Sequence, residues 1–460
     1  MGKKIGIVLA AGQGKRMKSK LYKVLHPVCG KPMVGHVVDM LEAVEADRSV
    51  VVVGHGAEAV RSYLDERVEY VMQEQQLGTG HAVLQASELL AQEEGVTFVV
   101  CGDTPLIRAD SLEAMHRLHV ESGAAATIMS AVLDQPQGYG RIVRDQHDLV
   151  QKIVEQKDCS EEEAAIQEIN TGTYCFDNRK LFEALEQVTN DNAQQEYYLT
   201  DVISILQSQG ETIQAYVLDD IRDSIGVNDR VALSQAEQWM RQRICETHMR
   251  NGVTIQDPSS VYIETGVEIG MDTQLLPGTI IKAGSKIGEQ CVLGPNTEID
   301  QSVVGDGCVI KQSVITESSL GHQVQVGPFA YIRPGSTIGN NVKIGDFVEI
   351  KKSVIGDGSK VPHLSYVGDA EVGSGVNIGC GTITANYDGM NKHVTRIEDG
   401  AFIGSNSNLI APVTVGKNAY VVAGSTITHN IDENGLAIAR ARQTTKPGYA
   451  EKLRQRKQKS

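Results

Sequence analysis

The chain has 460 residues, 41% of them hydrophobic, which predicts two or three domains with sizeable cores. Its formal net charge of −15 disfavours nucleic acid as a general partner. No stretch approaches the roughly 18 apolar residues of a membrane span, and the N-terminal sequence lacks a signal-peptide cleavage site. The eight cysteines have no paired short spacing, which argues against a zinc site or a disulfide framework. We therefore expect a soluble, cytosolic protein without stable membrane insertion.

The first 229 residues alternate short apolar runs with helical patterns. Four continuous, β-branched runs are typical of strands buried on both faces, and they span residues 5–11, 50–53, 68–72 and 98–101. Helical patterns occur at residues 32–44, 57–64, 81–90 and 109–122. This alternation predicts a doubly wound, mostly parallel α/β sheet of the Rossmann-like kind, with ligands at the carboxyl ends of its strands.

A glycine-rich loop, LAAGQGKRM, follows the first predicted strand. Gly12 and Gly14 let the backbone pass close to a ligand, and the loop amides can point at phosphate oxygens. A P-loop would need glycine in place of Leu9, and a Rossmann fingerprint would need glycine in place of Met17. An ordinary strand-to-helix turn therefore remains an alternative to a phosphate site. Three cations that could offset the charge of a triphosphate follow closely: Arg16, Lys20 and Lys23.

A carboxylate, Asp103, stands just after the strand predicted at 98–101. This position suits a Mg²⁺ ion bound to the phosphates of a nucleotide. An aspartate that merely caps the next loop would look the same, so this residue alone leaves the metal site open.

A long helical stretch at residues 229–250 separates the two halves of the chain. It ends at Asn251-Gly252, which is a helix stop signal. We predict three parts: an α/β domain at 1–229, a linker helix at 230–250 and a second domain at 251–460.

The second half repeats an aliphatic residue almost every six residues from Ile263 onward. Six residues make one short strand and one tight turn, and three such steps close a triangular coil around a shared aliphatic core. The step falls to five at several places, including Ile299 to Val304, which indicates shortened turns. The pattern predicts a parallel β-helix.

One polar excursion, residues 385–396, interrupts the six-residue repeat. Excursions from a rigid repeat scaffold often carry function, although a tolerated surface insertion explains this one equally well.

A histidine, His363, lies at a predicted tight corner in KVPHLSYVG. A lone histidine on a repeat protein is more often structural than catalytic. A metal site would need ligands at close spacing, which the coil histidines lack: His322, His363, His393 and His429.

Six segments resemble the nucleotidyltransferase domain that makes nucleotide sugars: LAAGQGKRM, QLGTGHA, GDTPL, YGRI, INTGTY and GVNDR. Together with the coil, the chain from about residue 5 to residue 442 resembles the bifunctional family of glucosamine-1-phosphate N-acetyltransferases and N-acetylglucosamine-1-phosphate uridyltransferases. The resemblance implies a left-handed β-helix of hexapeptide repeats, a homotrimer, a Mg²⁺ cofactor and a cytoplasmic enzyme. It also implies that the product supplies peptidoglycan and related envelope polymers.

For the first domain, the resemblance implies transfer of uridylyl from UTP to N-acetylglucosamine-1-phosphate, with release of pyrophosphate. The matching nucleotide-loop, phosphate and uracil positions are Leu9, Ala10, Ala11, Gly12, Arg16, Lys23, Gln73, Gly78 and Thr79. Gly140, Glu155 and Asn170 match the positions that hold the sugar, and Asp103 and Asn228 match those that hold Mg²⁺. The sugar phosphate is already a nucleophile, so aligning two anions and neutralising their charge is the main task. Lys15 departs from the family's usual threonine and could still serve the phosphates.

For the coil, the resemblance implies acetyl transfer from acetyl-CoA to glucosamine-1-phosphate, with His363 as the general base. A histidine with an ordinary pKa of about 6.5 suits removal of a proton from the substrate ammonium. Matching glucosamine-1-phosphate positions are Arg333, Lys351, Tyr366, Asn377 and Lys392, and matching acetyl-CoA positions are Asn386, Tyr387, Ser405, Ala423 and Arg440. Pro362 is less usual before this histidine.

Three functions are compatible with the sequence: a two-site enzyme, a single-site nucleotidyltransferase whose coil only oligomerises, and a structural solenoid with a binding head. The joint presence of the coil residues that match the family favours the first over the second. Asp103 and Asn228 beside the glycine-rich loop argue against the third.

Overall fold

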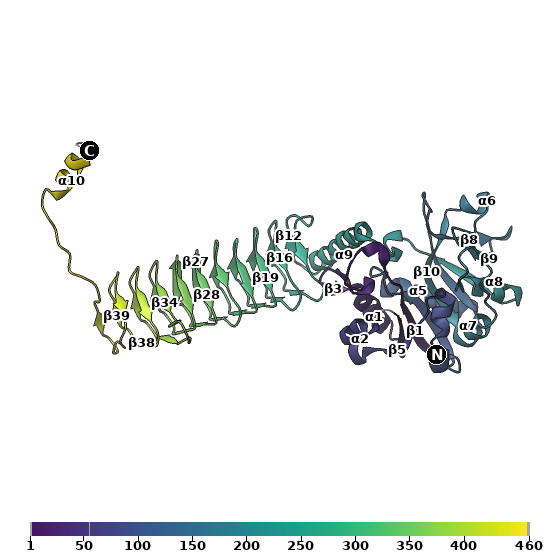
Figure 1. Ribbon diagram of the computed structural model, residues 1–460, viewed down its shortest axis with the longest axis horizontal. Coiled ribbons are helices and arrows are strands. Elements are labelled where there is room, and N and C mark those ends of the chain that lie inside the picture. The colour runs from purple at the N-terminus through teal and green to yellow at the C-terminus, as the bar shows by residue number, and fades with distance from the viewer. Residues whose placement is uncertain (1, 55, 458–460) are drawn as a thin grey trace. The chain divides into compact units, whose positions relative to one another are not determined.

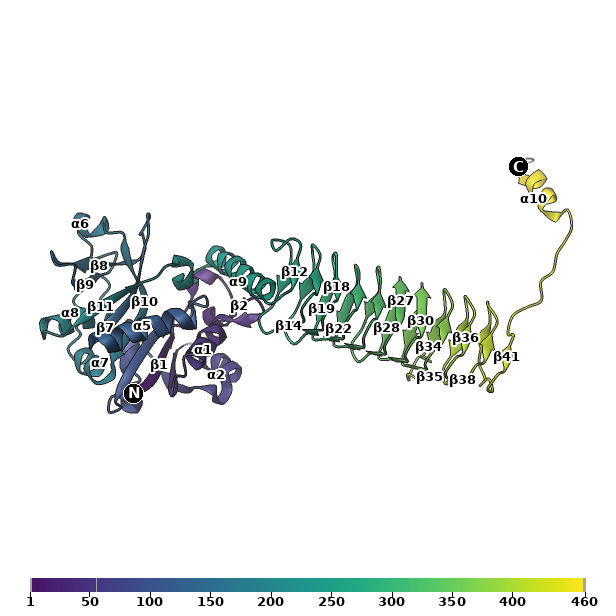
Figure 2. The same cartoon turned by 180° about the vertical axis from the view of Figure 1, so that it is seen from behind.

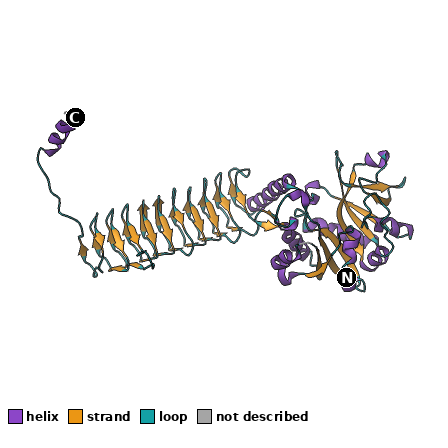
Figure 3. Ribbon diagram, viewed as in Figure 1, coloured by secondary structure: helices purple, strands orange, loops and turns teal. Residues whose placement is uncertain are grey.

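The computed structural model describes residues 2–54 and 56–457 (Figure 1). The chain divides into two compact units between Arg241 and Gln242, within the long helix α9 (Arg230–Arg250). The first unit mixes helices and strands, whereas the second is made almost entirely of short strands (Figure 3). Every helix within the described residues is too short or too polar to cross a bilayer.

The first unit is built on one nine-stranded, mostly parallel sheet in which β1 is central. Along the sheet the order is β11-β7-β10-β6-β1-β4-β5, and β10 runs antiparallel to both of its neighbours. The strands of this path are β1 (Lys3–Ala10), β4 (Arg48–Val53), β5 (Glu69–Met72), β6 (Gly95–Cys101), β7 (Ala126–Val132), β10 (Glu168–Asp177) and β11 (Ile213–Val217). A hairpin of β8 (Gly140–Arg144) and β9 (Val150–Val154) pairs with β10, and a small separate hairpin joins β2 (Pro27–Val28) to β3 (Lys31–Pro32).

Helices cover both faces of this sheet because its strands are apolar on both sides. Ile5 and Ile7 of β1 belong to one hydrophobic core, and Val8 and Ala10 to the other. The first core packs against α3 (Thr79–Leu84), α4 (Ser87–Leu90), α7 (Asn178–Leu185) and α8 (Asp201–Ser208). The second packs against α1 (Met33–Ala43), α2 (Ala57–Leu64) and α5 (Ala109–Ser122). The remaining helices are α6 (Glu161–Ala164), α10 (Tyr449–Lys457) and four 3₁₀ turns: η1 (Lys15–Met17), η2 (Lys23–Leu25), η3 (Asp65–Arg67) and η4 (Ile221–Ser224).

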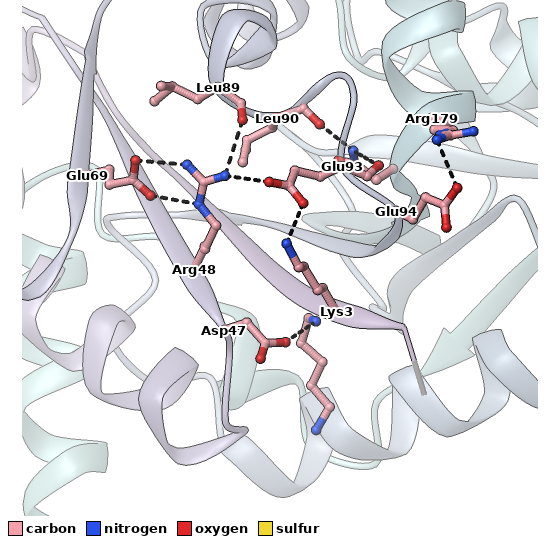
Figure 4. Close-up of polar contacts among 11 residues, drawn as sticks. Lys3, Asp47, Arg48, Glu69, Leu89, Leu90, Glu93, Glu94 and Arg179 are labelled. Atoms are coloured by element: carbon pink, nitrogen blue, oxygen red, sulfur yellow. Dashed lines mark hydrogen bonds and ion pairs between the residues drawn. The ribbon is translucent and has the colours of Figure 1, made fainter.

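An ion-pair network joins the amino-terminal ends of neighbouring strands (Figure 4). Arg48 at the start of β4 donates two 2.9 Å hydrogen bonds to Glu69 of β5 and one of 2.9 Å to Glu93. Lys3 of β1 donates to the other oxygen of Glu93 at 2.6 Å, and this contact holds the pKa of Glu93 below its usual range. Bidentate arginine pairs fix geometry as well as charge. The network therefore holds together the edge of the sheet opposite to its carboxyl ends.

The elements predicted for this half are present with small shifts at their ends, apart from one. The single helix predicted at 81–90 is wrong, because the chain forms α3 and α4 with an interruption at Gln85 and Ala86. The amides of these two residues bond three positions back, to Ala82 and Val83, which tightens the turn.

The second unit is a parallel β-helix, as the six-residue repeat predicts (Figure 2). Successive strands fall in turn on three parallel sheets, so each coil contributes one strand to each face. The first sheet contains β12 (Thr254–Ile255), β15 (Gln274–Leu275), β18 (Val292–Leu293), β21 (Val309–Ile310), β24 (Gln325–Val326), β27 (Lys343–Asp346), β30 (Lys360–His363), β33 (Asn377–Ile378), β36 (Phe402–Ile403), β39 (Tyr420–Val421) and β41 (Leu436–Ala437).

The second sheet contains β13 (Tyr262–Ile263), β16 (Ile280–Ile281), β19 (Glu298–Asp300), β22 (Val314–Thr316), β25 (Tyr331–Ile332), β28 (Glu349–Lys351), β31 (Tyr366–Gly368), β34 (Ile383–Ala385), β37 (Asn408–Ile410) and β40 (Thr426–Ile427). The third contains β14 (Glu268–Ile269), β17 (Lys286–Ile287), β20 (Val303–Val304), β23 (Ser319–Leu320), β26 (Thr337–Ile338), β29 (Val354–Ile355), β32 (Ala370–Val372), β35 (Thr395–Ile397) and β38 (Val413–Val415). Each strand pairs in register with the strand one coil away.

The repeated aliphatic residues form one continuous core inside the coil. Ile299 is fully buried, and it pairs with Ile281 on one side and Ile315 on the other. The register is kept across the shortened steps, so these steps trim turns rather than shift strands, as predicted.

Two neighbours on β29 test this core. Ile355 is fully buried and Val354 is 50% exposed. Ile355→Ala should lower the stability of the coil by about 3 kcal/mol through the cavity it leaves, whereas Val354→Ala should cost less than about 1 kcal/mol. Hydrogen exchange of coil peptides in a urea series measures both, and equal losses would contradict the inward orientation of Ile355.

Candidate functional sites

Most of the residues predicted to bind the nucleotide line one cavity of about 260 Å³ in the first unit. It opens at the carboxyl ends of β1, β5 and β6, the edge where a parallel sheet binds ligands. The predicted residues in its lining are Leu9, Ala10, Ala11, Gly12, Lys23, Gln73, Gly78, Thr79 and Asp103.

The glycine-rich loop leaves β1 and turns into η1 beside this cavity. Gly14 has a left-handed backbone with φ 61°, and a Cβ placed there would lie 2.5 Å from Cβ of Lys23. Glycine is therefore required for the lysine stem to pack against the loop. A Cβ on Gly12 would meet no other atom within 4 Å, so no side chain covers the loop backbone where it lines the cavity.

The predicted metal ligands come together around Lys23. Its Nζ bonds to the carboxylate of Asp103 and lies 2.8 Å from Oδ1 of Asn228. Arg16 Nη2 donates to the same Asn228 oxygen at 2.9 Å. The juxtaposition is fixed by the backbone, because the amide of Val227 donates to the Asp103 carbonyl at 2.8 Å. Two adjacent hard oxygen donors fit Mg²⁺, which binds through one or two such side chains together with substrate phosphates.

A further cation, Arg230 of the GVNDR segment, ties the same loop to the start of α9. Its Nε donates to the Met17 carbonyl at 3.2 Å, and its Nη1 lies 3.4 Å from Nδ1 of His26. Since Asn228 is two residues away, this arginine joins the loop to the segment that carries Asn228.

The predicted uracil segment is held by backbone contacts to Tyr197. Gly80 N donates to Tyr197 O at 2.8 Å, and Tyr197 N donates to Leu77 O at 2.8 Å. Gly78 has φ 115°, and a Cβ there would lie 2.5 Å from Tyr197 O, so no other residue fits. Thr79 Oγ1 accepts from the Leu199 amide at 3.0 Å.

The predicted sugar residues form a second group, on β8 to β10, outside the lining of the cavity. Gly140 pairs with Asn170 across the strands, and Asn170 donates to the Tyr174 hydroxyl at 2.7 Å. Burial raises the pKa of Glu155, and the Thr200 hydroxyl donates to this carboxylate at 3.3 Å. Gly172 connects the two groups, since Cys101 Sγ lies 3.7 Å from its carbonyl oxygen.

In the coil, His363 hydrogen-bonds to a carboxylate that the sequence analysis missed. Its Nδ1 lies 2.6 Å from Oδ1 of Asp346, the residue that pairs with it one coil earlier. The hydrogen bond with His363 lowers the pKa of Asp346, so the carboxylate is ionised at neutral pH. The imidazole is 57% exposed and is therefore accessible to a substrate.

Several predicted residues occupy one corner of the coil on successive turns. Lys360, Asn377, Phe402 and Tyr420 pair in series. This register places the following residues in one row along the corner: His363, Cys380, Ser405 and Ala423. Adjacent coils are about 4.8 Å apart, so the row offers small side chains over roughly three coil spacings. Arg440 lies just beyond it, with its Cδ 3.8 Å from a Cβ built on Gly424.

A basic cluster lies on the second sheet of the coil. Lys351 Nζ bonds to Asp369 at 2.8 Å, and the amide of Asn386 bonds to the same carboxylate. Contact with Lys351 lowers the pKa of Lys392, while the hydrogen bond that Lys351 donates to Asp369 raises the pKa of Lys351. Such a surplus of positive charge suits a phosphate.

Other members of this cluster come from neighbouring strands. Arg333 bonds to Glu349 at 2.7 Å, and its register places it beside Lys351. Tyr366 pairs with Glu349 on the next strand. Asn377 lies on the first sheet instead, and the chain does not bring it into this cluster.

The 385–396 excursion folds as a small hairpin. Tyr387 and Lys392 pair as an antiparallel bridge, and Asp388 accepts from the amides of Met390 and Asn391. The hairpin carries Asn386 and Lys392 to Lys351 rather than to the Ser405 row. The predicted acetyl-CoA residues are therefore divided between two corners of the coil, with Tyr387 60% exposed.

Comparison with known proteins agrees with both halves of this description. A model for nucleotidyl transferases matches residues 5–240. A model for bacterial transferase hexapeptide repeats matches residues 317–352 and 395–429. A model for the hexapeptide repeat of succinyl-transferase matches residues 285–312. A "Bifunctional protein GlmU" of Geobacillus sp. is 60% identical over 98% of this chain and 99% of its own length. Proteins of the same name in Brevibacillus brevis and Bacillus velezensis are 59% and 58% identical, over 98% of this chain and 98% and 99% of their own.

The chain belongs to the family of bifunctional GlmU proteins. The predicted fold class is confirmed: an α/β nucleotidyltransferase domain followed by a left-handed parallel β-helix of hexapeptide repeats.

Some residues of these two sites in the GlmU fold are absent from the sequence prediction. In the cavity they are Val24, Gln76, Ala82, Cys101 and Glu196. Cys101 precedes Asp103, and burial raises the pKa of its thiol to about 12, so it acts as a neutral wall. The sequence analysis does not predict Asp346 and Asp369 as site residues, because only the register of the coils shows that they lie beside His363 and Lys351.

Proposed function

We propose that this chain makes UDP-N-acetylglucosamine in two steps, one on each unit. On the coil, acetyl-CoA acetylates glucosamine-1-phosphate. In the cavity of the first unit, the product attacks UTP and releases pyrophosphate. The observation that carries the proposal is that membership in the GlmU family coincides with a cavity at the glycine-rich loop and, on the coil, with a His–Asp pair and a basic cluster.

In uridylyl transfer, a phosphate oxygen of the sugar phosphate attacks the α-phosphorus of UTP and the bond to the β-phosphate breaks. No proton has to be removed, so the chain's part is to bind and orient two anions. The loop amides at residues 9–12 face the phosphates, and Lys23 and Arg16 balance their charge. Glu155, Asn170 and Gly140 orient the sugar, with Glu155 accepting from its hydroxyls.

Asp103 and Asn228 would hold Mg²⁺, because their oxygens are hard donors already fixed against one another. When bound, the ion would supply positive charge at the phosphates. Lys23, which contacts both oxygens, is then placed to turn its ammonium to a phosphate.

In acetyl transfer, the substrate ammonium must lose a proton before its nitrogen attacks the thioester carbon. Asp346 accepts the Nδ1–H of His363, which leaves the lone pair on Nε2 to take that proton. That proton then neutralises the departing CoA sulfur as the C–S bond breaks, and the attacking nitrogen releases its second proton to solvent, which leaves the neutral amide. Arg333, Lys351 and Lys392 bind the sugar phosphate, with Tyr366 on the sugar, and Asn377, which one chain keeps on the first sheet, would join them only in an assembly of copies.

The corner row fits an extended cofactor arm. Cys380, Ser405 and Ala423 are small and follow His363 coil by coil, so a thin chain can lie along the corner. Arg440 stands at the far end, where a CoA phosphate would be. Asn386 and Tyr387 would also contact acetyl-CoA. Within one chain, however, these two residues lie at another corner of the coil, away from this row.

A homotrimer would resolve this division by forming each acetyl-transfer site between neighbouring copies. An exposed apolar stripe at the His363 corner supports the proposal: Phe329, Phe347 and Leu364 are 53%, 58% and 59% exposed. The two phenylalanine rings stack with centroids 5.4 Å apart. A continuous apolar stripe of this kind is typical of an interface.

The cytoplasm is the compartment that supplies UTP and acetyl-CoA together, and we place the protein there. Its product would serve peptidoglycan and related envelope polymers.

Paired variants test the two-site function. His363→Ala should lower acetyl transfer by about a thousandfold, within the range for loss of a general base, and leave uridylyl transfer nearly intact. Asp103→Ala should do the reverse, and chelation of divalent ions should stop only uridylyl transfer. CoA release and pyrophosphate release are the two assays. Parallel loss of both activities in each variant would contradict independent sites.

Asp346→Asn tests the orientation of the general base. An asparagine amide can donate to Nδ1, which favours the tautomer whose proton sits on Nε2, and acetyl transfer should fall about a hundredfold. Asp306, which stands 3.2 Å from His322 on an earlier coil, gives a matched control. Asp306→Asn should leave acetyl transfer unchanged, and equal effects of the two changes would exclude the orienting role.

Phe347→Glu tests the trimer. Sedimentation should show three copies for the wild-type chain and dissociated chains for the variant, because charge on the stripe opposes its burial. Acetyl transfer should fall with the trimer while uridylyl transfer remains. Val120→Glu, at a residue of α5 that is 56% exposed, should change neither property. A wild-type monomer or dimer would rule the trimer out.

A further inference from the structure

The side-chain amide of Gln73 has one orientation set by its surroundings. Gln73 follows β5, is 3% exposed and lines the nucleotide cavity. Its Nε2 lies 3.1 Å from the Gly78 carbonyl oxygen, which can only accept a hydrogen bond. In this structure the NH₂ end of the amide therefore faces Gly78, which settles the assignment of its two ends.

The second N–H of Gln73 is directed at His81 of the QLGTGHA segment. Nε2 of Gln73 lies 3.1 Å from Nδ1 of His81, so Nδ1 must accept. A neutral imidazole accepts at one nitrogen and donates at the other, which puts the His81 proton on Nε2. The neighbouring Gln85 amide lies 3.2 Å from that Nε2 and bonds to the His81 carbonyl at 3.0 Å instead.

This leaves Oε1 of Gln73 on the cavity side. Across residues 2–54 and 56–457, no hydrogen bond ends on this oxygen, which thus presents an acceptor to a ligand. Uracil carries a donor at N3, whereas cytosine carries an acceptor there. A fixed carbonyl oxygen would accept from the first base and repel the second.

We propose that His81 is a positioning residue that sets the preference for a uracil nucleotide over a cytosine nucleotide. It acts by holding the amide of Gln73 with its oxygen toward the base. His81 itself is not among the described residues that line the cavity, so it acts through Gln73. The inference rests on the proposed function in one respect, that Gln73 reads the nucleobase.

The position of His81 is fixed independently of the ligand. It lies on α3, whose start is bonded to the Tyr197 backbone, and its ring centroid is 6.4 Å from that of Tyr197. Without the Nδ1 acceptor, the Gly78 bond alone would hold the amide, and a net hydrogen bond of about 1 kcal/mol is a weak restraint. The amide could then turn its NH₂ toward N3 of cytosine.

The test measures kcat/KM for pyrophosphate release with UTP and with CTP, at saturating N-acetylglucosamine-1-phosphate. His81→Leu should lower the UTP-to-CTP ratio about tenfold, with a rise in the CTP value that loss of structure cannot produce. His81→Asn, whose Oδ1 can take the place of Nδ1, should keep most of the ratio. Gln85→Ala should leave the ratio unchanged.

Two further measurements separate the possible failures. Acetyl transfer by the same chain checks that the coil of each variant is folded and assembled, and a retained CTP value shows that the first unit is folded. If His81→Leu is inactive with both UTP and CTP, His81→Gln tests the same point. The glutamine amide reaches the position of Nε2 and leaves no acceptor at the position of Nδ1.

The outcomes are distinguishable. An unchanged ratio in Gln73→Ala would overturn the assignment of Gln73 to the base, and with it the proposed function of this segment. A reduced ratio in Gln73→Ala with an unchanged ratio in His81→Leu and His81→Gln would overturn the role of His81 alone. Equal losses with UTP and CTP in the His81 variants, or a fallen ratio in Gln85→Ala, would also overturn it.

Discussion

In-register pairing of parallel strands is the constraint on which both sites depend. In the coil it places equivalent residues of successive turns in rows about 4.8 Å apart, and the row of His363 and Asp346 is one of them. In the first unit it brings the carboxyl ends of β1 and β6 to one edge, because Leu9 pairs with Cys101. Side chains far apart in the sequence meet at these edges without any single residue having to bring them there.

The coil uses its rows to pair three of the proposed site residues with an acid one turn away. Lys351 bonds to Asp369 and Arg333 to Glu349, while His363 bonds to Asp346. An acid held at this distance keeps a cation in one place at modest cost in surface charge. An incoming phosphate can then share Lys351 and Arg333, since each has donors to spare beyond its one carboxylate.

Features that repeat along the chain can be predicted from the sequence. Contacts that depend on strand register or on a single interatomic distance cannot. The six-residue period suffices for the coil, since each inward residue such as Ile299 is aliphatic wherever the chain turns. Asp346 could be found only by counting one coil back from His363, and the varying length of the turns makes that count uncertain without coordinates. The break at Gln85 and Ala86 in the helix predicted at 81–90 follows from tight local bonds that helix propensity does not encode. The glycines at 12 and 14 indicate a close approach, but the contacts of Lys23 with Asp103 and Asn228 need the whole sheet.

The two ends of the nucleotide cavity are organised differently. At the end proposed for the phosphates, Lys23 contacts both Asp103 and Asn228, and Arg16 shares the Asn228 oxygen; such charged contacts are favourable over a range of geometries. At the base end, Gln73 is buried and held by directional bonds to Gly78 and His81. Discrimination between two nucleobases of similar size depends on which way a donor points, so the rigid network belongs at this end. In the proposed function, the charged groups then serve the reaction and the fixed polar groups serve the choice of substrate.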